Sequence, residues 1–257
     1  MKGIFVLFLL VTLIQLIYSA PPGQKVANGV SVSPKDFPYF AYLLTAFKSF
    51  NGQCGASLIS HNHVLTAAHC IMIRGTCERV SRMVVYLGSD IESKINHFEI
   101  RDYIIHEDYV KGCKGSIKAD IAILTLAESV PFSRSIMKIL LPPASVKREQ
   151  IEGLTAVVSG FGQDKNGSLT KRLQAVNVTI GTKSFCEKKK VYGGFICSEI
   201  HNGRMDRKGD SGGPLVINNT LYGIVSGGPT ELTAEYSKYT SIIFYRSWIL
   251  KNVDIIE

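Results

Sequence analysis

The chain has 257 residues, of which 46% are hydrophobic, 9% aromatic and 19% charged. This composition is typical of a globular protein and excludes a disordered or fibrous chain. A chain of this length forms one or two domains and buries a sizeable core without a stabilising metal. The step Leu141-Pro142-Pro143 is the best candidate for a crossing between two halves, because Pro breaks strand pairing and favours an extended path.

Lys and Arg number 29 and Asp and Glu 21, which gives a formal net charge of +8. The excess is spread along the chain, and its densest run is Lys188-Lys189-Lys190. Since no recognisable nucleic-acid-binding motif accompanies these charges, nucleic acid is not an expected partner. We interpret the basic residues as a solvated surface with mild attraction to acidic partners or cell surfaces.

Residues 1–20 have the parts of a secretory signal peptide. Lys2 precedes an apolar run from Ile4 to Ile17, and Ala20 supplies a small residue at the expected cut. Tyr18 is bulky where a small residue is usual. No later stretch is apolar over the roughly 18 residues that a membrane span needs. We therefore expect a soluble, extracellular product with no membrane partner.

After residue 30 the chain consists of short runs rich in β-branched and aromatic residues, separated by clusters of Gly, Asn, Asp or Ser. The predicted strands are 40–45, 83–87, 121–126, 154–159, 173–180 and 221–225. Many short strands with almost no helical periodicity indicate an all-β sandwich or barrel. The exception is 241–253, where Ile242, Tyr245, Trp248 and Ile249 recur at helical spacing and predict a helix that docks on a core.

The cysteines are even in number, which in an exported chain fits three disulfides. They are Cys54, Cys70, Cys77, Cys113, Cys186 and Cys197. The count alone leaves fifteen connectivities open, and a metal site is not expected because no C-x-x-C or His pair accompanies them. Acceptors for N-glycosylation stand at Asn166, Asn177 and Asn218, in agreement with export.

Three local strings together carry the residue types of nucleophilic acyl chemistry. They are Leu65-Thr66-Ala67-Ala68-His69-Cys70, Asp120-Ile121-Ala122-Ile123-Leu124 and Gly209-Asp210-Ser211-Gly212-Gly213-Pro214. A Ser hydroxyl becomes a good nucleophile when a neutral imidazole takes its proton, and a carboxylate on the other ring nitrogen fixes the tautomer. Glycines beside the Ser let backbone N–H groups approach a developing oxyanion.

With these strings the chain resembles a secreted serine endopeptidase of the chymotrypsin family, of an arthropod-like kind. The other matching motifs are Cys54-Gly55-Ala56-Ser57-Leu58, Ser159-Gly160-Phe161-Gly162 and Gly223-Ile224-Val225-Ser226. The resemblance implies two six-stranded antiparallel β-barrels with the active site between them. The protease domain would span 26–257, with barrels at about 26–141 and 142–240 and a C-terminal helix at about 241–253.

The same resemblance implies residue roles. His69 would be the general base, Asp120 its orienting carboxylate and Ser211 the nucleophile, with the backbone N–H groups of Gly209 and Ser211 forming the oxyanion hole. It pairs Cys54 with Cys70 and Cys186 with Cys197, which leaves Cys77 and Cys113 to each other. No cofactor and no metal are implied.

A zymogen is also implied, because Lys25-Val26-Ala27-Asn28-Gly29 resembles the activation site of the family. Cleavage after Lys25 would remove a pro-segment of residues 21–25 and free an α-amino group on Val26. That ammonium would pair with Asp210, whose buried carboxylate needs a partner. An activating protease is therefore an expected partner, besides protein or peptide substrates, and the chain is expected to be a monomer.

The substrate pocket departs from the family pattern. The resemblance places Met205, Asp206, Ser226, Gly228 and Ser237 around it, but the disulfide that usually ties its walls is missing, because Arg207 replaces the first Cys and 226–239 holds no second one. An apolar floor at Met205 would favour large apolar or aromatic residues. Alternatively Asp206 turns inward and attracts Lys or Arg, or Ser237 narrows the pocket.

The sequence is also compatible with two other functions. The barrels could belong to a protease-shaped secreted binding protein with little or no activity, although the intact His69, Asp120, Ser211 and Gly209 disfavour it. A small-ester hydrolase with the same site is a further alternative.

Overall fold

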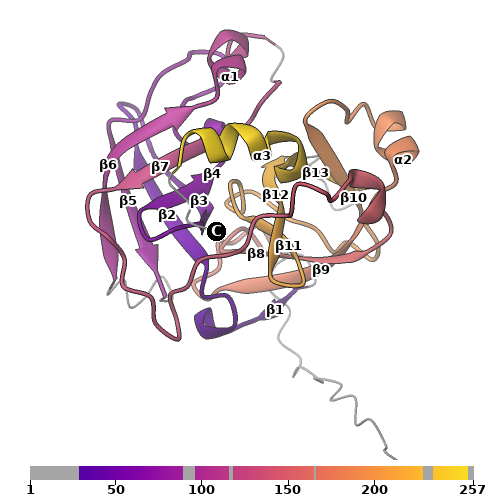
Figure 1. The fold of residues 1–257 in the computed structure, drawn as a ribbon, viewed down its shortest axis with the longest axis horizontal. Helices are drawn as coiled ribbons and strands as arrows, with labels where there is room; N and C mark the ends of the chain where they lie inside the picture. Colours follow the sequence, from indigo (N-terminus) through magenta and orange to yellow (C-terminus); the bar gives the residue numbers. More distant parts are fainter. Residues whose placement is uncertain (1–28, 89–95, 116–117, 165, 228–233, 254–257) are drawn as a thin grey trace, which may run out of the picture.

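The computed structural model describes residues 29–88, 96–115, 118–164, 166–227 and 234–253. The predicted signal peptide, Lys25, Val26 and Gly228 lie outside these described residues. Two barrels lie side by side, the first in purple and magenta and the second mainly in orange (Figure 1). This confirms the fold class that the sequence predicts.

The first barrel is closed in the strand order β2-β3-β4-β7-β6-β5. Its strands are β2 (Phe40–Ala46), β3 (Asn51–Leu58), β4 (His63–Thr66), β5 (Arg82–Leu87), β6 (His97–Ile105) and β7 (Ala122–Leu126). All the pairings are antiparallel. In β5, Met83, Val85 and Leu87 are buried while their neighbours are more exposed, because successive side chains of a strand point to opposite faces.

The second barrel follows the order β9-β10-β13-β12-β11-β8, and the pairing of β8 with β9 closes it. Its strands are β8 (Thr155–Gly160), β9 (Gln174–Ile180), β10 (Phe195–Glu199), β11 (Pro214–Ile217), β12 (Thr220–Gly227) and β13 (Tyr236–Ser241). The short strand β1 (Val30–Ser31) pairs with β9 and so joins the sheet of this barrel. The N-terminal end of the described chain therefore attaches to the barrel that is made later.

Helices are few and short. The 3-10 turns are η1 (Pro34–Asp36), η2 (Ala68–Cys70) and η3 (Arg148–Gln150), and the α-helices are α1 (Glu107–Gly112), α2 (Lys183–Lys188) and α3 (Ile242–Lys251). The sequence predicts α3 but neither α1 nor α2, because six residues are too few to show a 3.6-residue period.

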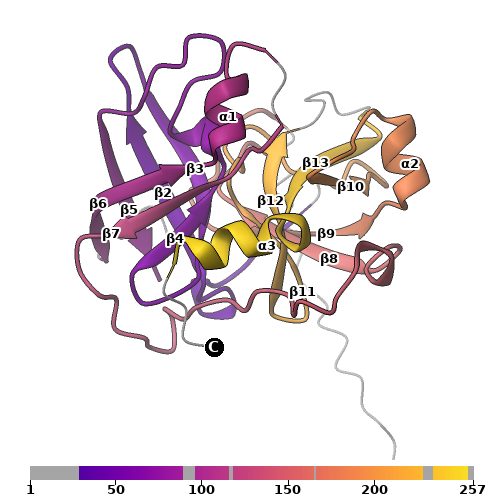
Figure 2. The same cartoon turned by 45° about the horizontal axis from the view of Figure 1, so that its top comes forward.

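Helix α3 starts at the N-cap Ser241, whose side chain accepts a hydrogen bond from Phe244 N. Its buried face joins the core of the first barrel, through Ile242, Tyr245 and Ile249. The Tyr245 hydroxyl donates a 2.7 Å hydrogen bond to the carbonyl of Lys118. Figure 2 shows α3 lying across the junction of the two barrels. Of the helices described, none is both long and apolar enough to pass through a lipid bilayer.

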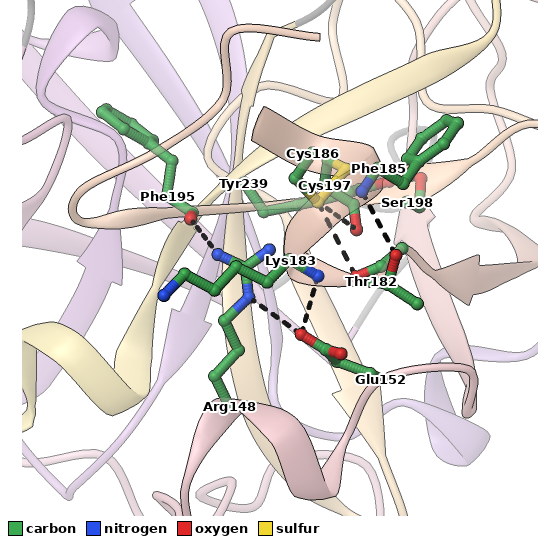
Figure 3. Close-up of a disulfide and its surroundings, with 11 residues drawn as sticks. Arg148, Glu152, Thr182, Lys183, Phe185, Cys186, Phe195, Cys197, Ser198 and Tyr239 are labelled. Carbon is green, nitrogen blue, oxygen red and sulfur yellow. Dashed lines mark hydrogen bonds and ion pairs between the residues drawn. A yellow bond between two sulfur atoms is a disulfide. The ribbon is translucent and has the colours of Figure 1, made fainter. Parts of the chain in front are cut away.

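Three disulfides join the pairs that the resemblance implies. Cys54 bonds to Cys70, Cys77 to Cys113 and Cys186 to Cys197. Figure 3 shows the last pair, which ties α2 to β10. Beside it, Glu152 accepts a 2.7 Å hydrogen bond from Lys183 N and lies 3.5 Å from Arg148 Nε (Figure 3).

Candidate active site

His69 is placed by the end of strand β4. The chain leaves β4 at Thr66 and turns through η2, so that His69 lies at the edge of the first barrel. The disulfide from Cys70 to Cys54 fastens this turn to β3. The His69 side chain is 26% exposed, so its ring is held in place by the barrel and still reaches solvent.

Asp120 lies two residues before the start of β7 and is fully buried. His69 Nδ1 lies 2.8 Å from Asp120 Oδ2, and His69 N donates a 2.9 Å hydrogen bond to Asp120 Oδ1. The carboxylate thus contacts the ring and the backbone of the same residue. This arrangement places the ring proton on Nδ1 and leaves Nε2 free to accept a proton.

The second barrel also holds Asp120. Ser226, at the end of β12, donates a 2.7 Å hydrogen bond to Asp120 Oδ2. Thr240 on β13 donates a 2.7 Å hydrogen bond from Oγ1 to the backbone carbonyl of Asp120. The family resemblance places Ser226 only at the substrate pocket and assigns no role to Thr240. The triad strings give no signal for either contact, because both depend on how the barrels dock.

The electrostatics of the pair follow from burial and mutual contact. Burial alone would lower the pKa of His69, but the charge and hydrogen bond of Asp120 raise it above its ordinary value. Lys238 on β13 opposes this increase through its positive charge. Burial would raise the pKa of Asp120, whereas His69 and the Ser226 hydrogen bond hold it below its usual range.

Ser211 lies in the turn before β11, against the first barrel. Its carbonyl accepts a 2.7 Å hydrogen bond from Gly55 N. A Cβ on Gly55 would lie 2.6 Å from the Cα of Gly213, so this close approach requires glycine. Ser211 and His69 line the same hollow between the barrels. The structure therefore brings the Ser and His strings together from opposite barrels.

The backbone at Gly209 and Ser211 offers two N–H groups that can bind a negative charge. Gly209 has φ of +101°, a left-handed conformation that favours glycine. Within the described residues, the amides of Gly209 and Ser211 donate to no protein acceptor. Two unused N–H groups beside Ser211 can bind an oxyanion.

Asp210, between Gly209 and Ser211, is almost completely buried. Its carboxylate accepts hydrogen bonds of 2.7 Å from Gly162 N and 2.8 Å from Arg207 N. Burial raises the pKa of Asp210 to about 7. The hydrogen bonds from Arg207 N and Gly162 N and the positive charge of Arg207 partly offset this increase, whereas the negative charge of Asp206 adds to it.

The predicted pocket residues include a buried carboxyl, Asp206, and a buried apolar side chain, Met205. Asp206 is buried, and its Oδ1 accepts a 2.9 Å hydrogen bond from the hydroxyl of Tyr239. Ser237 also hydrogen-bonds to this carboxyl, although burial still raises the Asp206 pKa. Met205 is only 1% exposed. The inward-facing group in this region is thus a carboxyl that contacts neutral hydroxyls.

One cluster of metal-ligand types occurs in the described part of the chain, namely Cys54, His69 and Cys70. Both of its sulfurs are joined in a disulfide, which leaves no thiolate to bind an ion. This cluster therefore does not form a metal site.

The arrangement matches known proteins over most of the chain. The profile of the Trypsin family matches residues 26–249. A chymotrypsin of the beetle Phaedon cochleariae is 34% identical over 89% of this chain and 82% of its own length. The human transmembrane protease serine 11A is 32% identical over 90% of this chain, which spans 56% of that relative. A solved HL collagenase structure has a TM-score of 0.78 at 26% identity and covers 90% of this chain and 100% of its own.

Proposed function

The chain belongs to the trypsin family of serine endopeptidases, and we propose that Ser211, His69 and Asp120 perform its peptide-bond hydrolysis. Ser211 Oγ attacks the substrate carbonyl while His69 Nε2 takes the hydroxyl proton. The C–N bond then breaks, and His69 returns that proton to the leaving amine. Water attacks the resulting ester by the same route and regenerates Ser211. The amides of Gly209 and Ser211 stabilise the oxyanion of each tetrahedral intermediate.

The observation that carries this proposal is the fixed contact of His69 with Asp120. A buried carboxylate that accepts bonds from both Nδ1 and the backbone N of His69 selects one tautomer of the ring. That tautomer is the one a general base needs, because it leaves Nε2 as the nitrogen that can accept the proton of the nucleophile. Binding without catalysis does not require a fixed tautomer of His69, so this arrangement disfavours the alternative of a protease-shaped binding protein.

The protein is made as a secreted zymogen, processed by removal of residues 1–20 and then cleaved after Lys25. Support comes from Asp210, whose carboxyl sits in a pocket formed by the backbone of Gly162 and Arg207. A Cβ on Gly160 or Gly162 would collide with this carboxyl. An ammonium on Val26 would neutralise it and hold the turn at Gly209 in position.

The primary pocket takes a basic side chain. Of the alternatives that the sequence leaves open, inward placement of Asp206 supports this one, because among the described residues its carboxyl contacts Tyr239 and Ser237 and no cation. A Lys or Arg of the substrate would supply the missing charge and lower the Asp206 pKa.

The substrates are proteins or peptides. The enzyme acts on them as a monomer outside the cell. Asn166, Asn177 and Asn218 are all exposed, as N-glycosylation requires. Asn218 has φ of +48° and lies in the turn between β11 and β12.

The direct test is labelling with a fluorophosphonate probe after limited trypsin treatment. We expect the wild-type protein to be labelled and Ser211→Ala to remain unlabelled at equal folding, because the probe bonds to an activated Ser hydroxyl. Hydrolysis of a peptide substrate, measured in parallel, separates an endopeptidase from a small-ester hydrolase. A folded, cleaved wild type that neither binds the probe nor cuts peptides would support the binding-protein alternative.

A further inference from the structure

A second hollow, of about 260 Å³, lies on the second barrel. Its walls come from the neighbouring strands β8, β9 and β10 and from the turn that follows β10. None of the residues that line it also lines the hollow at Ser211. A group bound here, which we call the outer hollow, therefore acts apart from the reacting atoms.

Alternation along β9 turns Asn177 toward the outer hollow. Val176 and Val178 are buried in the core of the second barrel, so Asn177 and Thr179 face outward. Asn177 is exposed, and both outward residues line the outer hollow. They are also the first and third positions of the acceptor sequence Asn177-Val178-Thr179. One of the three glycosylation acceptors thus opens into a preformed hollow.

The strands beside β9 surround Asn177 with polar groups. Thr155 on β8 and Glu199 on β10 both pair with Thr179, so their side chains share the outward face. His201 Nε2 lies 3.7 Å from Glu199 Oε2, and both residues line the outer hollow. Hydroxyls, a carboxylate and an imidazole are therefore gathered around one carboxamide.

The turn after β10 forms the remaining wall. Asn202 and Gly203 have left-handed φ angles of +55° and +65°, and Arg204 N donates a 3.2 Å hydrogen bond to the carbonyl of His201. Arg204 is exposed and lines the outer hollow. Two residues later the chain is buried at Asp206. A ligand that contacts Arg204 therefore also steadies the segment that leads to the substrate pocket.

The size and chemistry of the outer hollow suit one sugar ring. Sites for drug-sized ligands measure roughly 300–1,000 Å³, whereas this one measures about 260 Å³. Its lining side chains can donate to and accept from several sugar hydroxyls. A sugar attached to Asn177 stays at high effective concentration, so weak contacts are enough to keep it in place.

We propose that Asn177 carries an N-linked glycan whose first sugar occupies the outer hollow and holds turn 201–204 against β9 and β10. The proposal rests on the secretory route proposed above. There Asn177 Nδ2 forms a C–N bond to C1 of a lipid-linked oligosaccharide. The C1–O bond to the lipid pyrophosphate breaks, the pyrophosphate leaves with that electron pair, and one Nδ2 proton is released. Asn166 and Asn218 do not line the outer hollow, so a sugar on either gains none of these contacts.

Peptide mapping of the full chain secreted by eukaryotic cells tests the attachment. Peptide-N-glycosidase converts each glycosylated Asn to Asp, and the change in mass marks the modified position. We expect conversion at Asn177 and the loss of one glycan in Asn177→Gln. An unmodified Asn177 in the secreted chain would overturn the proposal.

Failure of the secretory route gives a different result. The chain would then remain in the cytosol with residues 1–20 attached. Joined to the signal peptide of another secreted protein, residues 21–257 would enter the route, and mapping of that chain would still decide whether Asn177 is modified.

Limited proteolysis tests whether the sugar is docked. Endoglycosidase trimming leaves one sugar on Asn177, and the Ser211→Ala background prevents self-digestion. Trypsin can cut after Arg204 only when turn 201–204 opens, because the next residue, Met205, is 1% exposed. The sugar should slow this cut at least about tenfold relative to Asn177→Gln, as one hydrogen bond to a charged group would.

A cut elsewhere in the same chains provides an internal control. Lys190 is exposed and does not line the outer hollow. The rate of cleavage after Lys190 should therefore be equal with and without the sugar. A sugar that slowed both cuts equally would act by general shielding, which contradicts docking.

Glu199→Ala tests the contact itself. It should reduce the ratio of the Arg204 cleavage rates between the Asn177→Gln chain and the sugar-bearing chain, because coupling requires both partners. Ser168→Ala is the matched control, since it removes the acceptor at Asn166 and should leave this ratio intact. Equal cleavage with and without the sugar, or a ratio that Glu199→Ala does not change, would refute the docked sugar.

Discussion

Ser226 Oγ reaches across the junction between the barrels and donates a 2.7 Å hydrogen bond to Asp120 Oδ2. The same oxygen lies 2.8 Å from His69 Nδ1, so the Ser226 hydroxyl and the catalytic imidazole share one acceptor. The orientation of the base therefore depends on both barrels.

Ser226→Ala should lower kcat by about tenfold, since a hydrogen bond to a charged group contributes roughly 1.5–3 kcal/mol. The Asp120 pKa should rise, because this bond favours the ionised form. Ester hydrolysis under saturating conditions measures the effect, with Ser226→Thr as the control that keeps a hydroxyl. Unchanged kcat in Ser226→Ala would mean that the His69 contacts alone hold Asp120.

Ser211→Ala and His69→Ala should each reduce kcat by several orders of magnitude. The double variant should be little worse than either single variant, because the two residues act as a unit in one proton transfer. Kinetics on a peptide substrate after activation measure all three. Additive losses would indicate that Ser211 is not activated by His69.

Lys238→Met should move the acid limb of the kcat/KM profile to higher pH. Activity needs neutral His69, whose pKa is lowered by burial and by the charge of Lys238 and raised by Asp120. Loss of the Lys238 charge raises this pKa, so the variant loses activity at a pH where the wild type retains it. Lys238→Arg keeps the charge and serves as the control. A limb that moves to lower pH would contradict the assignment.

Lys25→Gln should give a folded, inactive protein that trypsin cannot activate. In this uncleaved form, folding holds the Asp210 pKa at about 7, above the roughly 3.9 of an unfolded chain. Between these pH values the folded state binds the extra proton, so the contribution of Asp210 to stability falls as pH rises. Thermal unfolding from pH 4 to 8 measures it, and Asp210→Asn should remove this part of the slope. Full activity of Lys25→Gln would show that the Val26 ammonium is unnecessary.

Asp206→Asn should reduce kcat/KM for a Lys or Arg substrate by about 10- to 150-fold, since the charge-assisted bond is worth roughly 1.5–3 kcal/mol. A matched Phe substrate should change little, because it does not use the carboxylate. Met205→Asp, which adds a second acid, should increase the preference for Lys and Arg further. A wild-type preference for Phe that Asp206→Asn leaves intact would favour the apolar pocket instead.

The chemistry-bearing residues were predictable because the triad strings combine rare residue types for a stated reason. The structure places His69 in contact with Asp120, and strands form in all six of the predicted ranges. The Ser226 and Thr240 contacts with Asp120 were not predictable, since they depend on barrel docking. The direction in which the Asp206 side chain points was also not predictable from the sequence. It follows from the register of β13, in which Ser237 and Tyr239 point one way and Lys238 the other.

Each end of the described chain packs on the barrel that is formed mainly by the other end of the sequence. Strand β1 pairs with β9 in the second barrel, while Ile242, Tyr245 and Ile249 of α3 fill the core of the first. During synthesis the first barrel therefore has all its strands long before its apolar interior is covered. A chain stopped just before Ile242 would keep the strands of both barrels and leave that interior open to water. The core of the first barrel is thus completed by residues that are synthesised after the last strand of the second barrel.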